Sequence, residues 1–117
     1  MAVSSTFSST VAYTGDLSLT ETFPDAANGA SPGQIQILTL SSGDNTITPP
    51  SGGTTPVGVI IIPPASNPNV ITLKGVGGDT GVPIHKTLQT KLSLNNPAGT
   101  FILNAAATVT GLRLVWL

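Results

Sequence analysis

The sequence predicts an all-β protein, with a jelly-roll-like β-sandwich or a small barrel in a single domain. Three observations favour this fold class. The apolar residues are mainly aliphatic and often β-branched, which suits strands. The 13 glycines and 10 prolines leave no helix-compatible window of useful length. Short alternating segments are separated by turn residues at intervals of about ten positions, which is typical of sandwiches and barrels. An immunoglobulin-like sandwich is the second choice, because its Cys…Trp…Cys spacing is missing.

The chain divides into an N-terminal arm and one folded domain. Residues 1–10 are rich in Ser and Thr and poor in large apolar groups. We therefore expect a flexible arm over residues 1–10 and the β-sandwich domain over residues 11–117. Alternating segments and short apolar runs between turn residues predict the strands of this domain. They are residues 13–23, 34–40, 46–48, 57–62, 70–76, 87–94, 100–103 and 109–117.

Two of these predicted strands are apolar on both sides. In one of them, Ile35 and Ile37 share a face and Leu38 and Leu40 share the opposite face, which predicts a bulge or burial on both faces. The other strand, residues 57–62, is the most apolar run in the chain. It is too short to cross a membrane, so it is predicted to be a central strand that is buried on both faces.

A glycine-rich segment, residues 75–81, precedes a regularly alternating strand. The segment lacks the glycine spacing of a dinucleotide-binding loop, and extended residues follow it where such a loop requires a helix. We expect a tight turn with positive-φ glycines, in which Asp79 accepts hydrogen bonds from backbone amides. In the strand that follows, Leu88, Leu92 and Leu94 alternate with polar residues and are predicted to face the core.

The C-terminal strand is apolar on both of its faces. Leu112, Leu114 and Trp116 lie on one side, and we expect them to pack in the core. The alternate residues lie on the other side, so this strand is either covered by two layers or in contact with a neighbouring subunit. The candidate partner interface combines these alternate residues with two apolar residues of the arm. It comprises Val3, Phe7, Arg113, Val115 and Leu117.

Residues that often carry catalysis or bind metals are sparse. His85 is the only histidine, and no serine lies in a Gly-x-Ser-x-Gly context. The absence of cysteine excludes disulfides, thiolate nucleophiles and cysteine-based zinc sites. The aspartates predicted to lie in turns lack the spacing of a calcium-binding loop; they are Asp16, Asp25, Asp44 and Asp79. We therefore expect no enzymatic activity, no catalytic residue, no cofactor and no bound metal.

Low charge is the most unusual property of the composition. Charged residues make up 8% of the chain, whereas an ordinary soluble domain has about 25%. The formal net charge of −1 and the few dispersed basic residues give no basis for binding nucleic acid or an anionic membrane. Low charge suits a surface that is held against other protein, since charges are costly to desolvate. The N-terminus lacks the basic and apolar regions of a secretory signal, so we expect synthesis in a cytoplasm.

Three segments of the C-terminal half resemble small virion proteins of tailed bacteriophages. They are residues 57–64 with their double proline, residues 71–81, and residues 108–117. Within that group, the chain is similar in style to the decoration, or cement, proteins of icosahedral heads. This resemblance implies a non-enzymatic structural protein on the capsid surface of the virion. It also implies binding to the major capsid protein, and assembly as a homo-oligomer, a trimer.

Two other functions are possible for such a sequence. The first is a receptor- or glycan-binding knob of a head or tail fibre, although glycan binding usually needs exposed aromatic platforms and few rings are present. The second is a small hydrolase that uses His85, for which the sequence supplies no recognisable partner residues.

Overall fold

Ten β-strands lie in the part of the chain that the computed structural model describes, namely residues 9–13, 19–23, 35–50, 56–95 and 99–117. No helix is present in these residues, so the prediction of an all-β protein is confirmed. The strands are β1 (Ser9–Tyr13), β2 (Leu19–Phe23), β3 (Ile35–Leu40), β4 (Gly43–Ile47), β5 (Gly58–Ile62), β6 (Ile71–Lys74), β7 (Val82–Ile84), β8 (Thr90–Ser93), β9 (Phe101–Ala105) and β10 (Val109–Trp116).

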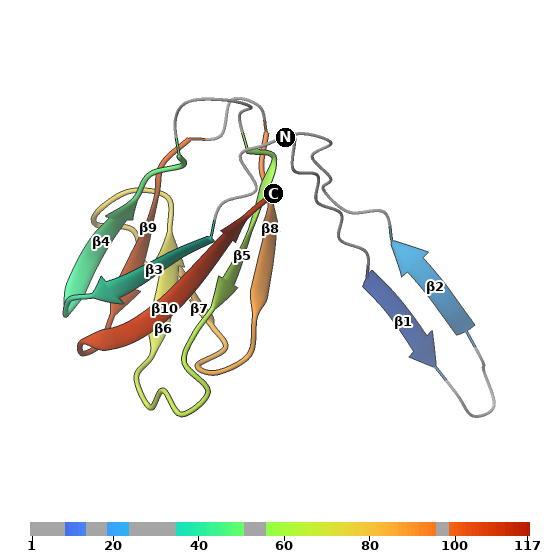
Figure 1. Cartoon of the computed structure of the whole chain (residues 1–117), viewed down its shortest axis with the longest axis horizontal. Coiled ribbons are helices and arrows are strands. Elements are labelled where there is room, and N and C mark those ends of the chain that lie inside the picture. Colours follow the sequence, from blue (N-terminus) through green and yellow to red (C-terminus); the bar gives the residue numbers. More distant parts are fainter. Residues whose placement is uncertain (1–8, 14–18, 24–34, 51–55, 96–98) are drawn as a thin grey trace.

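Eight strands form two antiparallel sheets with the strand orders β3-β10-β5-β8 and β4-β9-β6-β7 (Figure 1). The pairs are nested: β6 pairs with β7, β5 with β8, β4 with β9, and β3 with β10. Strands β3 to β10 thus form a long antiparallel hairpin, centred on the β6–β7 turn, that is folded into two layers. This is the strand arrangement of a jelly roll, so the first-choice fold is confirmed and the immunoglobulin-like alternative is wrong.

The two N-terminal strands form a separate two-stranded ladder. β1 pairs with β2 along its whole length, and neither strand joins the two larger sheets. The prediction of one strand over residues 13–23 is therefore wrong, since one strand ends at Tyr13 and another begins at Leu19. Gly15 and Asp16, between the two strands, are residue types that favour turns.

The inward faces of the two sheets form one hydrophobic core. As predicted, Leu112, Leu114 and Trp116 of β10 are completely buried. The Trp116 ring packs near Phe101, with 6.4 Å between ring centroids and 50° between the ring planes. Its indole Nε1–H donates a hydrogen bond to Gln36 Oε1 at 3.0 Å, so the polar edge of this buried ring is satisfied. The other buried apolar residues are Leu40, Ile47, Val59, Ile61, Ile71, Leu103, Ala105, Val109 and Leu117.

A bulge lies in β10 and not in β3, where it was predicted as one of two outcomes. The register between these strands shifts between Thr110 and Leu112, and the extra residue, Gly111, has a φ of +86°. Positive φ is the conformation that glycine adopts without strain in bulges of this kind. β3 itself alternates regularly, and the alternative prediction, burial on both faces, is also wrong: Ile35 and Ile37 are 66% and 72% exposed.

Two further predictions about burial are wrong. Leu88 is 61% exposed, because β8 begins only at Thr90 and Leu88 lies in the preceding turn. Its backbone N–H donates to His85 Nδ1 at 2.9 Å. The strand over residues 57–62 is buried on one face only, since Val59 and Ile61 are completely buried whereas Ile60 and Ile62 remain partly exposed.

The side chain of Asn45 closes the short connection between β3 and β4. Its Oδ1 accepts hydrogen bonds from the N–H and the hydroxyl of Ser41, at 3.0 and 3.1 Å. Its Nδ2 donates to the carbonyl oxygens of Ser41, Gly43 and Leu103. The chain can therefore cross between the sheets through Ser41 and Ser42 alone, and β4 begins at Gly43, earlier than the predicted strand at residues 46–48.

We expect Asn45→Ala to lower the free energy of unfolding by about 2 kcal/mol, because several backbone groups of the connection between β3 and β4 lose their hydrogen-bond partner. Urea denaturation followed by circular dichroism measures this difference. Thr46→Ala is the control, since Thr46 is the exposed neighbour on the same strand and should change the free energy by less than about 0.5 kcal/mol. Equal effects of the two substitutions would contradict this role for Asn45.

Both the backbone conformation and the surroundings of position 81 require a glycine. The φ of Gly81 is +74°, and an added Cβ would lie 2.5 Å from Leu73 O and 2.7 Å from side-chain atoms of Thr72 and Lys74. We expect Gly81→Ala to destabilise the protein by about 2 to 4 kcal/mol, as judged by chemical denaturation. Gly99→Ala is the matched control, because Gly99 has an ordinary φ and open space around it. A stable Gly81→Ala variant would show that the 75–81 loop rearranges freely.

Candidate protein-protein interface

The outer faces of the two sheets differ in polarity. On the sheet β4-β9-β6-β7, Asp44, Asn104 and Thr72 lie side by side across three strands, as do Thr46, Ile102 and Lys74. All but Ile102 are polar. This polar face is the ordinary arrangement for one side of an antiparallel sheet that is exposed to water.

Asp44 forms side-chain hydrogen bonds with two other residues of the polar face. Its Oδ1 accepts hydrogen bonds from Asn104 Nδ2 at 2.6 Å and from Lys74 Nζ at 3.2 Å. The hydrogen bond from Asn104, followed by that from Lys74, lowers the pKa of the Asp44 carboxyl below its ordinary value. Asp44 thus lies in a strand and not in the predicted turn, and its hydrogen bonds stay within the sheet.

The outer face of the other sheet is mainly apolar across β3, β10 and β5. Arg113 of β10 lies opposite Ile37 of β3 and Ile62 of β5, and Val115 lies opposite Ile35 and Ile60 in the same way. Directly opposed residues in antiparallel strands point to the same face, so these six side chains form two adjacent rows of three. We call this surface the isoleucine face; it comprises Ile35, Ile37, Ile60, Ile62, Arg113 and Val115.

The isoleucine face is exposed in the isolated chain. Ile35, Ile37 and Arg113 are exposed, and Ile60, Ile62 and Val115 are partly exposed. Scattered exposed apolar residues need no explanation, but a contiguous group across three neighbouring strands indicates an interaction surface. With neighbouring strands about 4.8 Å apart, the face is about 10 Å wide from β3 to β5 before side chains are counted.

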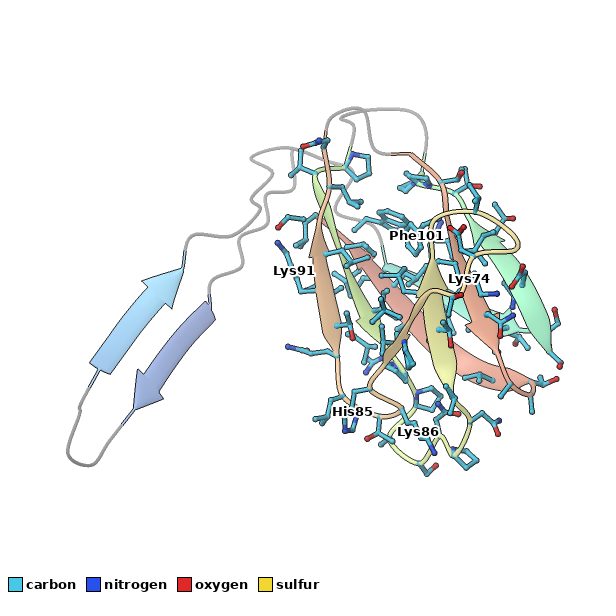
Figure 2. All side chains as sticks on the ribbon, turned by 180° about the vertical axis from the view of Figure 1, so that it is seen from behind. Lys74, His85, Lys86, Lys91 and Phe101 are labelled. Carbon is cyan, nitrogen blue, oxygen red and sulfur yellow. The ribbon has the colours of Figure 1, made fainter. Side chains whose placement is uncertain are left out.

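Lys91 lies at the margin of this face. It is the cross-strand neighbour of Ile60, and its Nζ donates to Ser93 Oγ at 2.7 Å. Partial burial lowers the pKa of the Lys91 ammonium, because desolvation disfavours the charged form. Figure 2 shows Lys91 on β8, well separated from Lys74 of the polar face.

The structure brings together two of the five residues predicted for a partner interface. Arg113 and Val115 both lie on the isoleucine face. Leu117 does not, since it is 3% exposed and its backbone pairs with that of Val57 and Gly58; the alternation predicted for it ends with β10 at Trp116. Val3 and Phe7 lie outside the described residues.

Sequence reasoning missed the four isoleucines of this face. A signal was present in the sequence. Ile35 and Ile37 are two positions apart on one predicted strand and therefore share a face, and the same is true of Ile60 and Ile62 on another. This signal could not be used without the strand order, which places β3 and β5 on either side of β10.

A cavity of about 590 Å³ lies between the last strands of the two sheets, β7 and β8. Its walls include Leu73, Val82, Leu92 and Phe101, together with residues of the 75–81 loop, and they are mainly apolar. Phe101 and Lys74 are labelled beside this loop in Figure 2. The size is that of a small-molecule site. Lys74, Asp79 and Thr80 are the polar residues of its lining.

The other motifs singled out in the sequence have local structural roles. In the glycine-rich loop, Gly78 and Gly81 have positive φ and Asp79 Oδ2 accepts from the N–H of Val76, as predicted. His85 is exposed, and its Nδ1 accepts hydrogen bonds from the N–H groups of Thr87 and Leu88. Within the described ranges, no three His, Asp or Glu side chains gather as metal ligands do.

Comparisons of this chain with protein-family models, with curated proteins and with solved structures find no match. The residues placed by the structure also include no helix that is long and apolar enough to span a membrane.

The lowered pKa of Asp44 predicts a pH-dependent contribution to stability. A carboxyl whose pKa is lower in the folded state stabilises the fold above its unfolded-state pKa and loses this contribution as the pH falls. We expect Asp44→Asn to lower the midpoint of urea denaturation at pH 7, and the difference from the natural protein to shrink below about pH 4. Thr46→Ala, a neighbour without an ionisable group, should show no such pH dependence. A constant difference for Asp44→Asn from pH 7 to pH 2 would contradict this assignment.

Proposed function

We propose that this chain is a non-enzymatic structural protein that binds the outer surface of a virion shell through its isoleucine face. In this role it decorates and stabilises the head, with the major capsid protein as its partner. The observation that carries the proposal is the contrast between the two outer faces of one sandwich. One face is polar except for Ile102, whereas the other presents four isoleucines and a valine to solvent.

The chemistry of the isoleucine face suits contact with another protein. Its side chains are β-branched and lose little conformational freedom on burial, and burial of apolar surface contributes about 25 cal/mol per Å². Arg113, in the middle of one row, supplies the specific polar contact. A guanidinium surrounded by apolar groups requires a carboxylate or carbonyl on the partner when the surface is covered.

The fold and the low charge support the same proposal. Jelly rolls occur in viral capsid domains and in lectins, although a fold by itself does not assign a function. A shell presents many identical sites, so weak contacts repeated over the lattice are sufficient when the decorating protein is itself an oligomer.

The alternative is a receptor- or glycan-binding knob of a head or tail fibre. The cavity between β7 and β8 favours this alternative, and its apolar walls suit a protein side chain better than a sugar. Trp116 is completely buried and is therefore not a platform for a sugar ring. A glycan array and a receptor-binding assay test this alternative directly.

Quantitative mass spectrometry of purified particles tests the proposed function. We expect the ratio of this chain to the major shell protein to be near one to one, because a decoration protein covers the whole lattice. A few dozen copies per particle would favour the fibre knob. Absence from the particles would overturn both assignments.

A binding experiment tests whether the isoleucine face makes the contact. We expect Val115→Lys to weaken binding to shells that lack the protein by at least about tenfold, since a cation is placed at the centre of an apolar contact. Thr46→Lys makes the same change on the polar face and should bind as the natural protein does. Equal binding by both variants, with unchanged melting temperatures, would show that another surface contacts the shell.

A further inference from the structure

β3 differs from the other three edge strands of the two four-stranded sheets. The edge strands of these sheets are β3 and β8 in one, and β4 and β7 in the other. An edge strand exposes unpaired N–H and C=O groups, and proteins usually protect such strands with charges or prolines. β8 carries Lys91, β4 carries Asp44, and β7 has Pro83 at its centre. β3, with the sequence IQILTL, has neither a charge nor a proline.

β3 is also a long and regular edge. It has six residues and no bulge, because the register shift of the β3–β10 pair lies on the β10 side. Ile35 and Ile37, its outward-facing isoleucines, are 66% and 72% exposed. Both the backbone edge and the adjoining side chains are thus available for strand addition. No described residue pairs with this edge.

We propose that the free edge of β3 pairs with β3 of a second copy of this chain, antiparallel and related by a two-fold axis. The resulting dimer contains one continuous sheet of eight strands. This inference concerns the chain alone and does not depend on the proposed binding to a shell. Because the interface is isologous, it predicts a dimer in place of the trimer that the resemblance to decoration proteins implies.

The side chains define the register of this pairing. Opposed residues in antiparallel strands share a face. The isoleucines of both copies therefore lie on the same face only in the register with Ile37 opposite Ile37, or in registers shifted from it by an even number of residues. The register with Ile37 opposite Ile37 of the second copy pairs residues 35–39 of both strands and places Ile35 opposite Thr39. The two isoleucine faces then lie next to each other in one surface of twice the size.

Charge favours a second copy over an unrelated charged partner. β3 carries no ionisable side chain, so self-pairing brings no like charges into opposition. Arg113 lies one strand inward, and the two copies of Arg113 would be separated by three strand spacings, about 14 Å. At that distance their repulsion is largely screened at physiological ionic strength.

Sedimentation velocity over a range of protein concentrations tests the dimer. We expect the purified chain to form a concentration-dependent dimer, and Ile37→Lys to raise its dissociation constant by at least about tenfold through opposed lysines. Ile37 is so exposed that its replacement should leave the melting temperature unchanged. Thr46→Lys, on the edge strand β4, should remain dimeric. A chain that is monomeric at all concentrations, or trimeric, would overturn the proposal.

Single-cysteine variants test the geometry, since the natural chain has no cysteine. We expect Ile37→Cys to form a disulfide-linked dimer under mild oxidation, because opposed Cα atoms in antiparallel strands are about 4.5 to 5.5 Å apart. Val115→Cys and Thr46→Cys should remain unlinked. Linking through Val115→Cys would indicate face-to-face stacking of the isoleucine faces and overturn the edge pairing. Failure of Ile37→Cys to link would overturn it as well.

Discussion

Gly111 adds one residue to β10 opposite β3, and this bulge allows Val109 before it and Leu112 after it both to face the core. After the bulge, Leu112, Leu114 and Trp116 point inward, and Arg113 and Val115 point outward. β10 is paired on both sides, with β3 and with β5. The inward-facing residues of β10 therefore lie opposite inward-facing residues of both neighbours. A slip of one residue would exchange the two faces and place Arg113 in the core.

The same alternation of inward and outward side chains gives one sheet a mainly apolar exterior. The inward positions of β10 and β5 carry completely buried side chains such as Leu112, Leu114 and Ile61. The outward positions in the two rows of the isoleucine face are also occupied by β-branched apolar residues, except for Arg113. In the other sheet, the outward positions of β4 and β9 carry Asp44, Thr46 and Asn104, and Ile102 is the one apolar residue among them. The two sheets contribute to one core, so the difference between their exteriors is not required by the stability of the fold.

The isoleucine face and the free edge of β3 meet along one strand, and together they give the chain two routes to association. The face covers a partner through side chains, whereas the edge extends the sheet through backbone hydrogen bonds. These routes are compatible, because pairing at the edge leaves the face uncovered and enlarges it. Low charge serves both routes, since few ions have to be desolvated when the surfaces are covered.

The sequence by itself determined the fold class, the core positions of β10 and the turn in residues 75–81. These features depend on local properties: alternation, β-branching, and the conformational freedom of glycine. Only the tertiary structure decided that Ile35, Ile37, Ile60 and Ile62 form one surface with Arg113 and Val115, because strand order and register join residues that are distant in the chain. The bulge at Gly111 and the burial of Leu117 were also decided at this level, since each depends on the neighbouring strand and not on the residue's own segment.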